Sequence, residues 1–261
     1  TVGYTQSSSD SAKMKDAAGN AVATLSSAKS VTVTNDTAVP TVASVTSSTS
    51  DGTFKVGDTV AVQVKFSEAV VVNTTGGTPK ITLETGTTDR SVNYTSGSES
   101  DTLVFNYTVQ NGDIAADLDY TGTTSLALNG GTIKDLAGNA ATLTLASPGA
   151  SGSLANAKAL VVDGVLPTIS TAAANAGTKT ITLTMSEAIA SGSPANGDFA
   201  VLVGSASNAV TNVAVSGASV VLTVTNVIAN DATVTVGYTQ SSSDSAKMKD
   251  GGGNAVATLS S

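Results

Sequence analysis

The stretch TVAVQVKF, residues 59–66, decides the fold class, because apolar side chains occupy every second position along it. Successive side chains of a β-strand point to opposite faces of the sheet, so this alternation predicts a half-buried strand. The same period recurs in TLVFNYTV (102–109), TITLTM (180–185) and VVLTVTNV (220–227). Threonine and valine dominate these segments, as is typical of strands.

Short clusters of glycine, asparagine, aspartate and serine separate the predicted strands, and such clusters are typical of turns. No window of twelve residues shows a helical period with caps. Hydrophobic residues make up 40% of the chain and alternate with polar ones, which argues against disorder. Many short strands joined by turns therefore predict an all-β protein built from antiparallel sandwiches.

Composition excludes several functional classes. The chain contains no histidine and no cysteine, so a Ser-His-Asp triad, a cysteine nucleophile, a histidine-ligated zinc and a disulfide are all ruled out. A net charge of −8 with 3% aromatic residues disfavours nucleic-acid binding. The longest apolar runs are short strands such as ALVV (159–162), so no membrane insertion by this segment is expected. With nothing that argues for a sugar-binding cleft either, we predict no enzyme and no organic cofactor.

The chain carries the same 27-residue phrase twice, at residues 1–27 and 235–261. Twenty-five of the 27 positions are identical, and only Ala17-Ala18 and Gly251-Gly252 differ. In the opening copy the phrase is followed by SVTVTN (30–35), a predicted strand. The closing copy ends at Ser261, so the module that contains it is predicted to lack a strand of this type.

A coarser repeat divides the chain into modules. An aspartate before a proline-containing linker is followed by a strand that ends in Ser-Glu and later by a Lys-Asp turn, as in IKDLAGN (133–139) and MKDGGGN (248–254). This order predicts three parts. Residues 1–36 are the C-terminal strands of a preceding module plus a linker, residues 37–163 are one complete module, and residues 164–261 are a second module without its last strand.

The middle module resembles the immunoglobulin-like tandem repeats of giant bacterial cell-surface and adhesin-type proteins, in SDGTFKVGDTVAVQVKFSEAV (50–70) and KALVVD (158–163). The last module, with VTVGYTQSSSDSAKMKDGGGNAVATLSS (234–261), is similar to repeats of cyanobacterial swimming-associated surface proteins. The resemblance implies immunoglobulin-like β-sandwich modules in an elongated array. It also implies a role as a stalk or spacer, often stiffened by calcium.

Oxygen ligands are the only metal-binding chemistry that the chain offers, and calcium takes six to eight of them. Strand direction predicts where carboxylates would gather, since a strand that returns to the entry of a module ends near the linker and near the turn before the last strand. This reasoning gives three candidate groups of metal ligands: Asp36, Glu68 and Asp135 at one junction; Asp163, Glu187 and Asp250 at the next; and Asp16 at a preceding junction.

A second interpretation of these carboxylates stays open. An aspartate followed by Gly-Asn is also an ordinary turn, in which the carboxylate accepts backbone N–H groups and glycine takes a positive φ. No EF-hand loop is present in the sequence. A further ion at Asp113, Asp117 and Asp119 is conceivable, although a loop followed by a strand is the favoured interpretation there.

We therefore predict a structural repeat unit of a long extracellular bacterial surface protein or filament. Its partners would be neighbouring copies of the same repeat, joined head to tail. Two alternatives remain. The chain could be the subunit of a fibre that polymerises by β-strand donation, with SVTVTN as the donated strand. It could also be an adhesin domain that binds a glycan or a host surface.

Overall fold

The computed structural model describes residues 5, 8–9, 13–24 and 35–260. The chain divides into two units, Thr1–Ala38 and Val39–Ser261. Strands account for 44% of the residues that the structure describes and helices for 3%, which confirms the prediction of an all-β protein. Most of the strand predicted at residues 30–35 lies outside the described residues.

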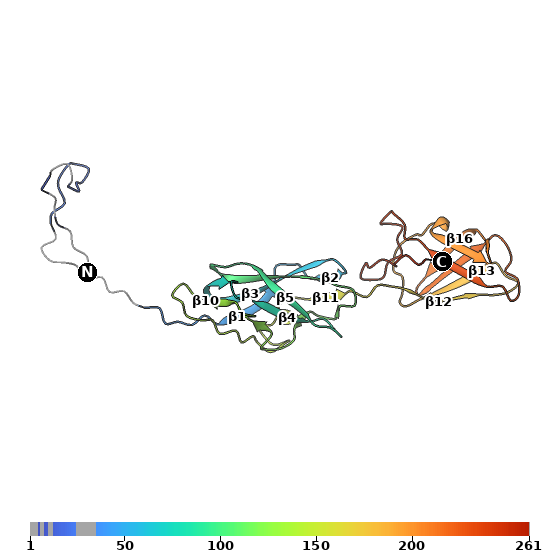
Figure 1. Ribbon diagram of the computed structural model, residues 1–261, viewed down its shortest axis with the longest axis horizontal. Coiled ribbons are helices and arrows are strands. Elements are labelled where there is room, and N and C mark those ends of the chain that lie inside the picture. The colour runs from blue at the N-terminus through green and yellow to red at the C-terminus, as the bar shows by residue number, and fades with distance from the viewer. Residues whose placement is uncertain (1–4, 6–7, 10–12, 25–34, 261) are drawn as a thin grey trace. The chain divides into compact units, whose positions relative to one another are not determined.

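The largest sheet of the second unit is built around one long strand, β3 (Thr59–Asn73), which pairs antiparallel with β1 (Val42–Ser47) and with β6 (Ser100–Thr108). Figure 1 shows these strands gathered in the blue-to-green part of the ribbon. The order along the sheet is β1-β3-β6-β5-β4-β8, and β9 and β10 pair with β4 and β3. The remaining members are β4 (Lys80–Glu84), β5 (Arg90–Ser96), β8 (Asp119–Tyr120), β9 (Leu126–Ala127) and β10 (Thr132–Lys134).

A smaller sheet has the order β2-β11-β7. Its central strand β11 (Leu160–Asp163) runs parallel to β2 (Gly52–Lys55) and antiparallel to β7 (Ile114–Ala115). The short helix α1 (Leu154–Ala157) precedes β11, and the hydroxyl of Ser153 caps its N-terminus by accepting the N–H of Asn156.

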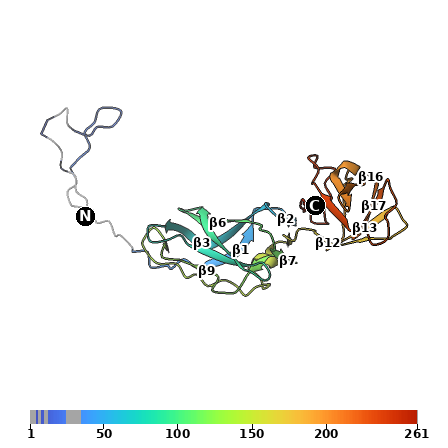
Figure 2. The same ribbon diagram turned by 45° about the vertical axis from the view of Figure 1, so that its right-hand side comes forward.

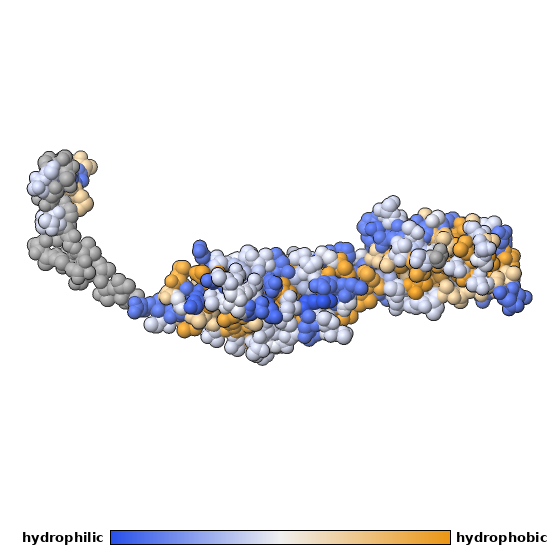
Figure 3. Space-filling model, in the orientation of Figure 1, coloured by the Kyte–Doolittle hydropathy of each residue, from blue (hydrophilic) through white to orange (hydrophobic). Residues whose placement is uncertain are grey.

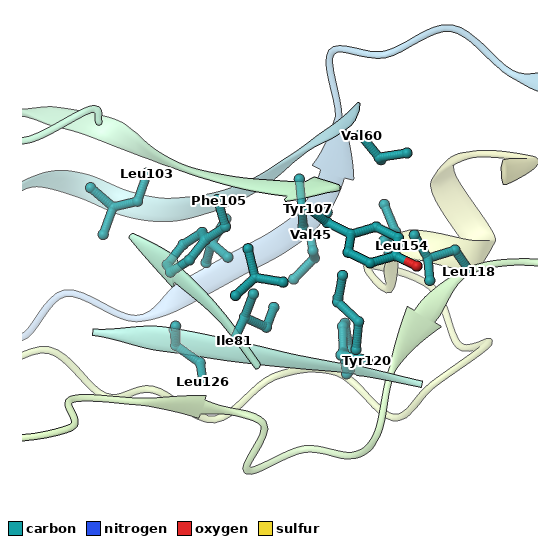
Figure 4. Close-up of a cluster of buried hydrophobic side chains, with 14 of the residues drawn as sticks. Val45, Val60, Ile81, Leu103, Phe105, Tyr107, Leu118, Tyr120, Leu126 and Leu154 are labelled. Carbon is teal, nitrogen blue, oxygen red and sulfur yellow. The ribbon is translucent and has the colours of Figure 1, made fainter. Parts of the chain in front are cut away.

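The period-two pattern has the burial that the sequence predicts. The side chains of Val60, Val62, Val64 and Phe66 on β3 are at most 1% exposed, and the intervening residues face outward. Figure 4 shows Leu103, Phe105 and Tyr107 of β6 packed with side chains from several other segments. We call this cluster, whose buried members run from Val45 to Val162, the first core.

A second group of strands follows in the chain and forms two sheets, and Figure 2 shows β13, β16 and β17 lying together. One sheet has the order β12-β13-β17-β16 and the other the order β15-β14-β18. The strands are β12 (Ile169–Ala174), β13 (Thr180–Met185), β14 (Phe199–Val203), β15 (Ala206–Ser207), β16 (Val210–Ser216), β17 (Ser219–Val224) and β18 (Val234–Tyr238), with a 3₁₀ turn η2 (Asn196–Asp198) before β14. Their buried side chains, from Ile181 to Val256, form the second core.

The two cores share no buried residue, since the last buried member of the first core is Val162 and the first buried member of the second is Ile181. Two hydrogen bonds hold Gly164 to the loop before β7. Its N–H donates to the carbonyl of Asp113 (2.7 Å), and its carbonyl accepts the N–H of Gly112 (2.8 Å). A Cβ at Gly164 would collide with the carbonyl of Gln110, so only glycine fits here. The division into a module at 37–163 and another at 164–261 stays a prediction.

Apolar side chains also reach the surface, as the orange areas on both groups of strands show in Figure 3. Ile114 is 54% exposed, Val161 is 37% exposed and Val165 is 39% exposed. Among the described residues, no helix is both long enough and apolar enough to cross a membrane.

One ion pair lies inside the first core. The Asp113 side chain is fully buried and accepts Nε–H of Arg90 and the hydroxyl of Tyr107, both at 2.7 Å, as well as the N–H of Gln110 at 3.0 Å. Burial and the neighbouring Asp113 raise the pKa of Tyr107, so its hydroxyl stays a proton donor. Asp113 is therefore an internal anchor for the loop before β7.

We expect Arg90→Met to lower the free energy of unfolding by roughly 3 kcal/mol, because it leaves the buried Asp113 without its counter-charge. The matched control is Lys65→Met, which removes a half-exposed pair with Asp101 at 3.6 Å and should cost less than about 1 kcal/mol. Urea unfolding of the two variants measures both values. Equal losses would show that the Arg90–Asp113 pair has no special weight.

Candidate metal centre

The Lys-Asp-x-x-Gly-Asn motif folds in the same way at all three places where it occurs. In each loop the aspartate accepts the backbone N–H of an asparagine four positions later on one oxygen, at 2.8 to 2.9 Å, and its side-chain amide on the other, at 2.7 to 3.1 Å. The three pairs are Asp16–Asn20, Asp135–Asn139 and Asp250–Asn254. The predicted turn is therefore present, and it uses both carboxylate oxygens locally.

A glycine before the asparagine closes each loop with a positive φ, which is +87° at Gly19, +98° at Gly138 and +91° at Gly253. Only glycine adopts this region without strain. A single antiparallel bridge joins the lysine and the alanine that flank each loop. The motif residues thus fix the shape of the loop, whereas the contacts of its carboxylate with residues outside the loop depend on the surrounding structure.

The loop of Asp250 brings three carboxylates together. Asp163 is the last residue of β11, Glu187 follows β13, and Asp250 opens the loop after β18. One oxygen from each of the three side chains lies within 4.8 Å of the other two. The structure thus gathers Asp163, Glu187 and Asp250, as strand direction predicted, and we call this group the carboxylate cluster.

The cluster lies in a setting that disfavours negative charge. Asp250 is 2% exposed, and the exposed apolar residues Ile114, Val161 and Val165 line the same pocket as Asp163 and Glu187. Burial and then Asp250 raise the pKa of Asp163. Burial, Asp250 and Asp163 together raise the pKa of Glu187.

No positive charge compensates the cluster within the described part of the chain. None of the ion pairs found there includes Asp163, Glu187 or Asp250. The Oε1 atom of Glu187 is buried and has no hydrogen-bond partner. A cation that takes carboxylate oxygens would supply both the missing charge and the missing partner.

Asn254 connects the cluster to the turn after β2, a role that the sequence did not reveal. Its side-chain carbonyl accepts the N–H of Val56 (3.0 Å), and its side-chain amide donates to the carbonyl of Asp163 (2.8 Å) as well as to Asp250 (3.0 Å). Asn254 is 2% exposed. Because Val56 lies almost two hundred positions earlier, the motif alone carries no signal for this contact.

Gly252 lies directly against the carboxylate of Asp163, and a Cβ at Gly252 would collide with it. The opening copy of the repeated phrase has Ala18 at this position. The change from Ala-Ala to Gly-Gly therefore affects the space beside the cluster as well as the flexibility of the turn.

The other candidate ligands divide between the two units. In the second unit, one oxygen of Glu68 lies within 4.8 Å of one oxygen of Asp135. Burial opposes the charge of Asp135, but hydrogen bonds from Asn139, Gly138 and Ala137 together lower its pKa. In the first unit, Asp36 accepts the N–H of Ala38 (2.9 Å), and Asp16 forms its own loop with Asn20. The predicted meeting of Asp36 with Glu68 and Asp135 joins two units and stays a prediction.

In the acidic stretch near residue 113, the carboxylates accept hydrogen bonds from backbone N–H groups. Asp117 accepts the N–H of Leu160 (3.2 Å), and Asp119 accepts the N–H of Gly149 (2.9 Å). Together with the Arg90–Asp113 pair, these contacts agree with the interpretation of this stretch as a structured loop.

Residues 191–243 match a family described as "Putative flagellar system-associated repeat". This segment contains β14 to β18 and so most of the second core. The match supports the resemblance to a swimming-associated repeat for this part of the chain. No curated protein matches the chain.

We expect Asn254→Ala to destabilise the second unit by about 2 kcal/mol, because it leaves the N–H of Val56 and the carbonyl of Asp163 without their partner. Asn20→Ala removes the same kind of asparagine from an exposed loop and should change the free energy of unfolding by less than about 0.5 kcal/mol. Thermal unfolding of both variants provides the comparison. If the two variants melt alike, the contacts of Asn254 with Val56 and Asp163 contribute nothing.

The raised pKa of Glu187 predicts a pH dependence. The folded protein holds this proton more tightly than the unfolded chain, so the contribution of Glu187 favours the fold at low pH and is lost as pH rises from the ordinary to the raised pKa. Without divalent cations, the stability of Glu187→Gln should therefore increase relative to the native chain over this interval. Denaturant titrations in EDTA at several pH values measure the difference, and a difference that stays constant with pH would contradict the prediction.

Proposed function

We propose that this chain is a structural repeat unit of a long extracellular bacterial surface protein or filament associated with swimming, in which immunoglobulin-like modules follow one another as a stalk. Support comes from the two separate cores, the repeated 27-residue phrase and the match of residues 191–243 to a flagellar system-associated repeat. Its partners are neighbouring copies of the repeat. Antibody labelling of intact cells tests the proposed location.

The observation that carries the proposal is the carboxylate cluster, which lies where the first core ends and the second begins. Its three members belong to β11, to the segment after β13 and to the Asp250 loop. A cation held by all three would join segments from both cores. A joint fixed in this way holds the orientation of one module relative to the next, which a stiff spacer requires.

Calcium fits this donor set better than other cations. The ligands are oxygens only, they are three carboxylates, and they come from separate segments whose spacing can adjust. Calcium accepts irregular sets of carboxylate, carbonyl and water oxygens, whereas magnesium requires a nearly ideal octahedron. Burial and then the neighbouring carboxylates raise the pKa values of Asp163 and Glu187, and binding also removes the repulsion between these carboxylates.

We expect calcium to raise the thermal midpoint of the native chain, with a stabilisation of about 2.7 kcal/mol at a free concentration one hundred times the dissociation constant. Asp163→Asn should make the calcium-free protein more stable, because it removes one of three repelling charges, and should abolish most of the calcium effect. Glu99→Gln makes the same charge change at an exposed hairpin residue and should leave calcium binding intact.

Isothermal titration and thermal unfolding, each with calcium and with EDTA, measure these effects. No heat of binding together with an unchanged midpoint in EDTA would remove calcium from the proposal. Equal calcium responses of Asp163→Asn and Glu99→Gln would move the cation away from the cluster.

A further inference from the structure

The strand β18 forms an edge of its sheet. It pairs antiparallel with β14 along its whole length, from Phe199 opposite Tyr238 to Val203 opposite Val234. Its outer side has one partner among the described residues, a single bridge between Tyr238 and Leu259. An edge of this kind presents unpaired backbone groups that can accept another strand.

The hydrogen-bond pattern shows which backbone groups are open. On the inner side, Thr239 donates to Asp198 and the carbonyl of Thr233 accepts from Gly204, both at 2.8 Å, so the odd-numbered residues of β18 face β14. The backbone N–H and C=O groups of the even-numbered residues therefore point away from β14, because hydrogen-bonded and non-bonded pairs alternate in an antiparallel ladder. Within the described chain, the outward N–H and C=O groups of Val234 and Val236 have no partner.

The outer ladder has already begun at one end. Tyr238 donates its N–H to the carbonyl of Leu259 (2.9 Å) and accepts the N–H of Leu259 (2.7 Å). This reciprocal pair is the first rung of an antiparallel pairing. A strand added beyond it would pass Val236 and Val234 in turn.

A buried hydroxyl without a partner lies on the same strand. The Tyr238 side chain is 1% exposed, and its hydroxyl has no hydrogen-bond partner in the described structure. Burial raises the pKa of Tyr238, and the nearby N–H of Met248 offsets part of this rise but cannot accept the hydroxyl proton. In the first core, by contrast, the buried Tyr120 has a partner, because its hydroxyl donates to the carbonyl of Ala146 (2.7 Å).

The first core also has a strand that the second lacks within the described residues. That strand is β11, which pairs antiparallel with β7 and follows the dipeptide Ala157-Lys158 before it ends in Asp163. Residues 28–36, AKSVTVTND, likewise begin with Ala-Lys, alternate valine with polar residues and end in aspartate. The 27-residue phrase that precedes them, at residues 1–27, recurs at 235–261, where its Leu259 forms the bridge to Tyr238 of β18.

We propose that the outer edge of β18 binds residues 28–36 of a second copy of this chain as an added antiparallel strand. The donated valines, Val31 and Val33, lie on one face of such a strand and add to the second core, while Thr32 and Thr34 face away from it. Backbone hydrogen bonds to Val234 and Val236 give affinity, and the valines give register. The interaction is independent of the carboxylate cluster.

Two variants separate donor from acceptor, and a third is the control for the donor. Val31→Asp with Val33→Asp disables the donated strand and leaves β18 intact, whereas Thr32→Asp with Thr34→Asp makes the same charge change on the opposite face. Val236→Pro removes one outward N–H from β18 without removing a bond to β14, because proline is tolerated on the open side of an edge strand.

Sedimentation velocity over a range of concentrations tests the assembly, in calcium and in EDTA. The native chain and the threonine variant should associate as concentration rises, and the two disabled variants should each remain monomeric. A mixture of the valine variant and Val236→Pro should form dimers and nothing larger, because only one acceptor and one donor remain. Association that survives in the valine variant alone, or a native chain that stays monomeric, overturns the proposal.

Hydrogen exchange on the valine variant gives a second readout that does not require Val236→Pro to fold. A synthetic peptide of residues 28–36 should slow exchange at the amides of Val234 and Val236 by at least about tenfold, while Thr235 and Gly237, already bonded to β14, change little. A peptide with Asp at positions 31 and 33 should have no effect. Protection in the native chain that is independent of concentration would show that the strand comes from the same molecule, and this result also overturns the proposal.

Discussion

Electrostatic repulsion among three carboxylates is the main constraint on the segment of the structure between the two cores. One oxygen each of Asp163, Glu187 and Asp250 lies within 4.8 Å of the other two, and burial together with the neighbouring carboxylates raises the pKa values of Asp163 and Glu187. Folding brings these groups together although their charges oppose it. The burial of two β-sheet cores supplies the free energy that holds these carboxylates together. A bound cation would neutralise their repulsion and be coordinated by their oxygens.

Local and distant contacts contribute differently to this arrangement. The Asp-to-Asn loop forms three times with the same hydrogen bonds, so its shape follows from the motif alone. At Asp250 the same loop also reaches Val56 and Asp163 through Asn254. One structural element can therefore serve as a simple turn in one place and as part of a joint in another.

The sequence was sufficient for the features that have a period or a direction. Alternation along β3 and β6 predicted which side chains are buried, and the order of strands predicted that Asp163, Glu187 and Asp250 would converge. It was not sufficient for pairs that only the packed sheets bring together, such as Arg90 with Asp113 and Asn254 with Val56. Arg90 and Asp113 stand in no pattern that distinguishes them from solvated side chains, and the motif that contains Asn254 also forms the exposed loop of Asn20. The sandwich arrangement itself rests on resemblance.

The parallel pairing of β2 with β11 has a mechanical consequence. The two strands run in the same direction, so a force that pulls β2 toward the N-terminus and β11 toward the C-terminus slides them past each other. All the hydrogen bonds between them then carry load at the same time, whereas a hairpin pulled at its open end loses them one by one. Asp163, at the end of β11, is the residue through which such tension would leave the first core.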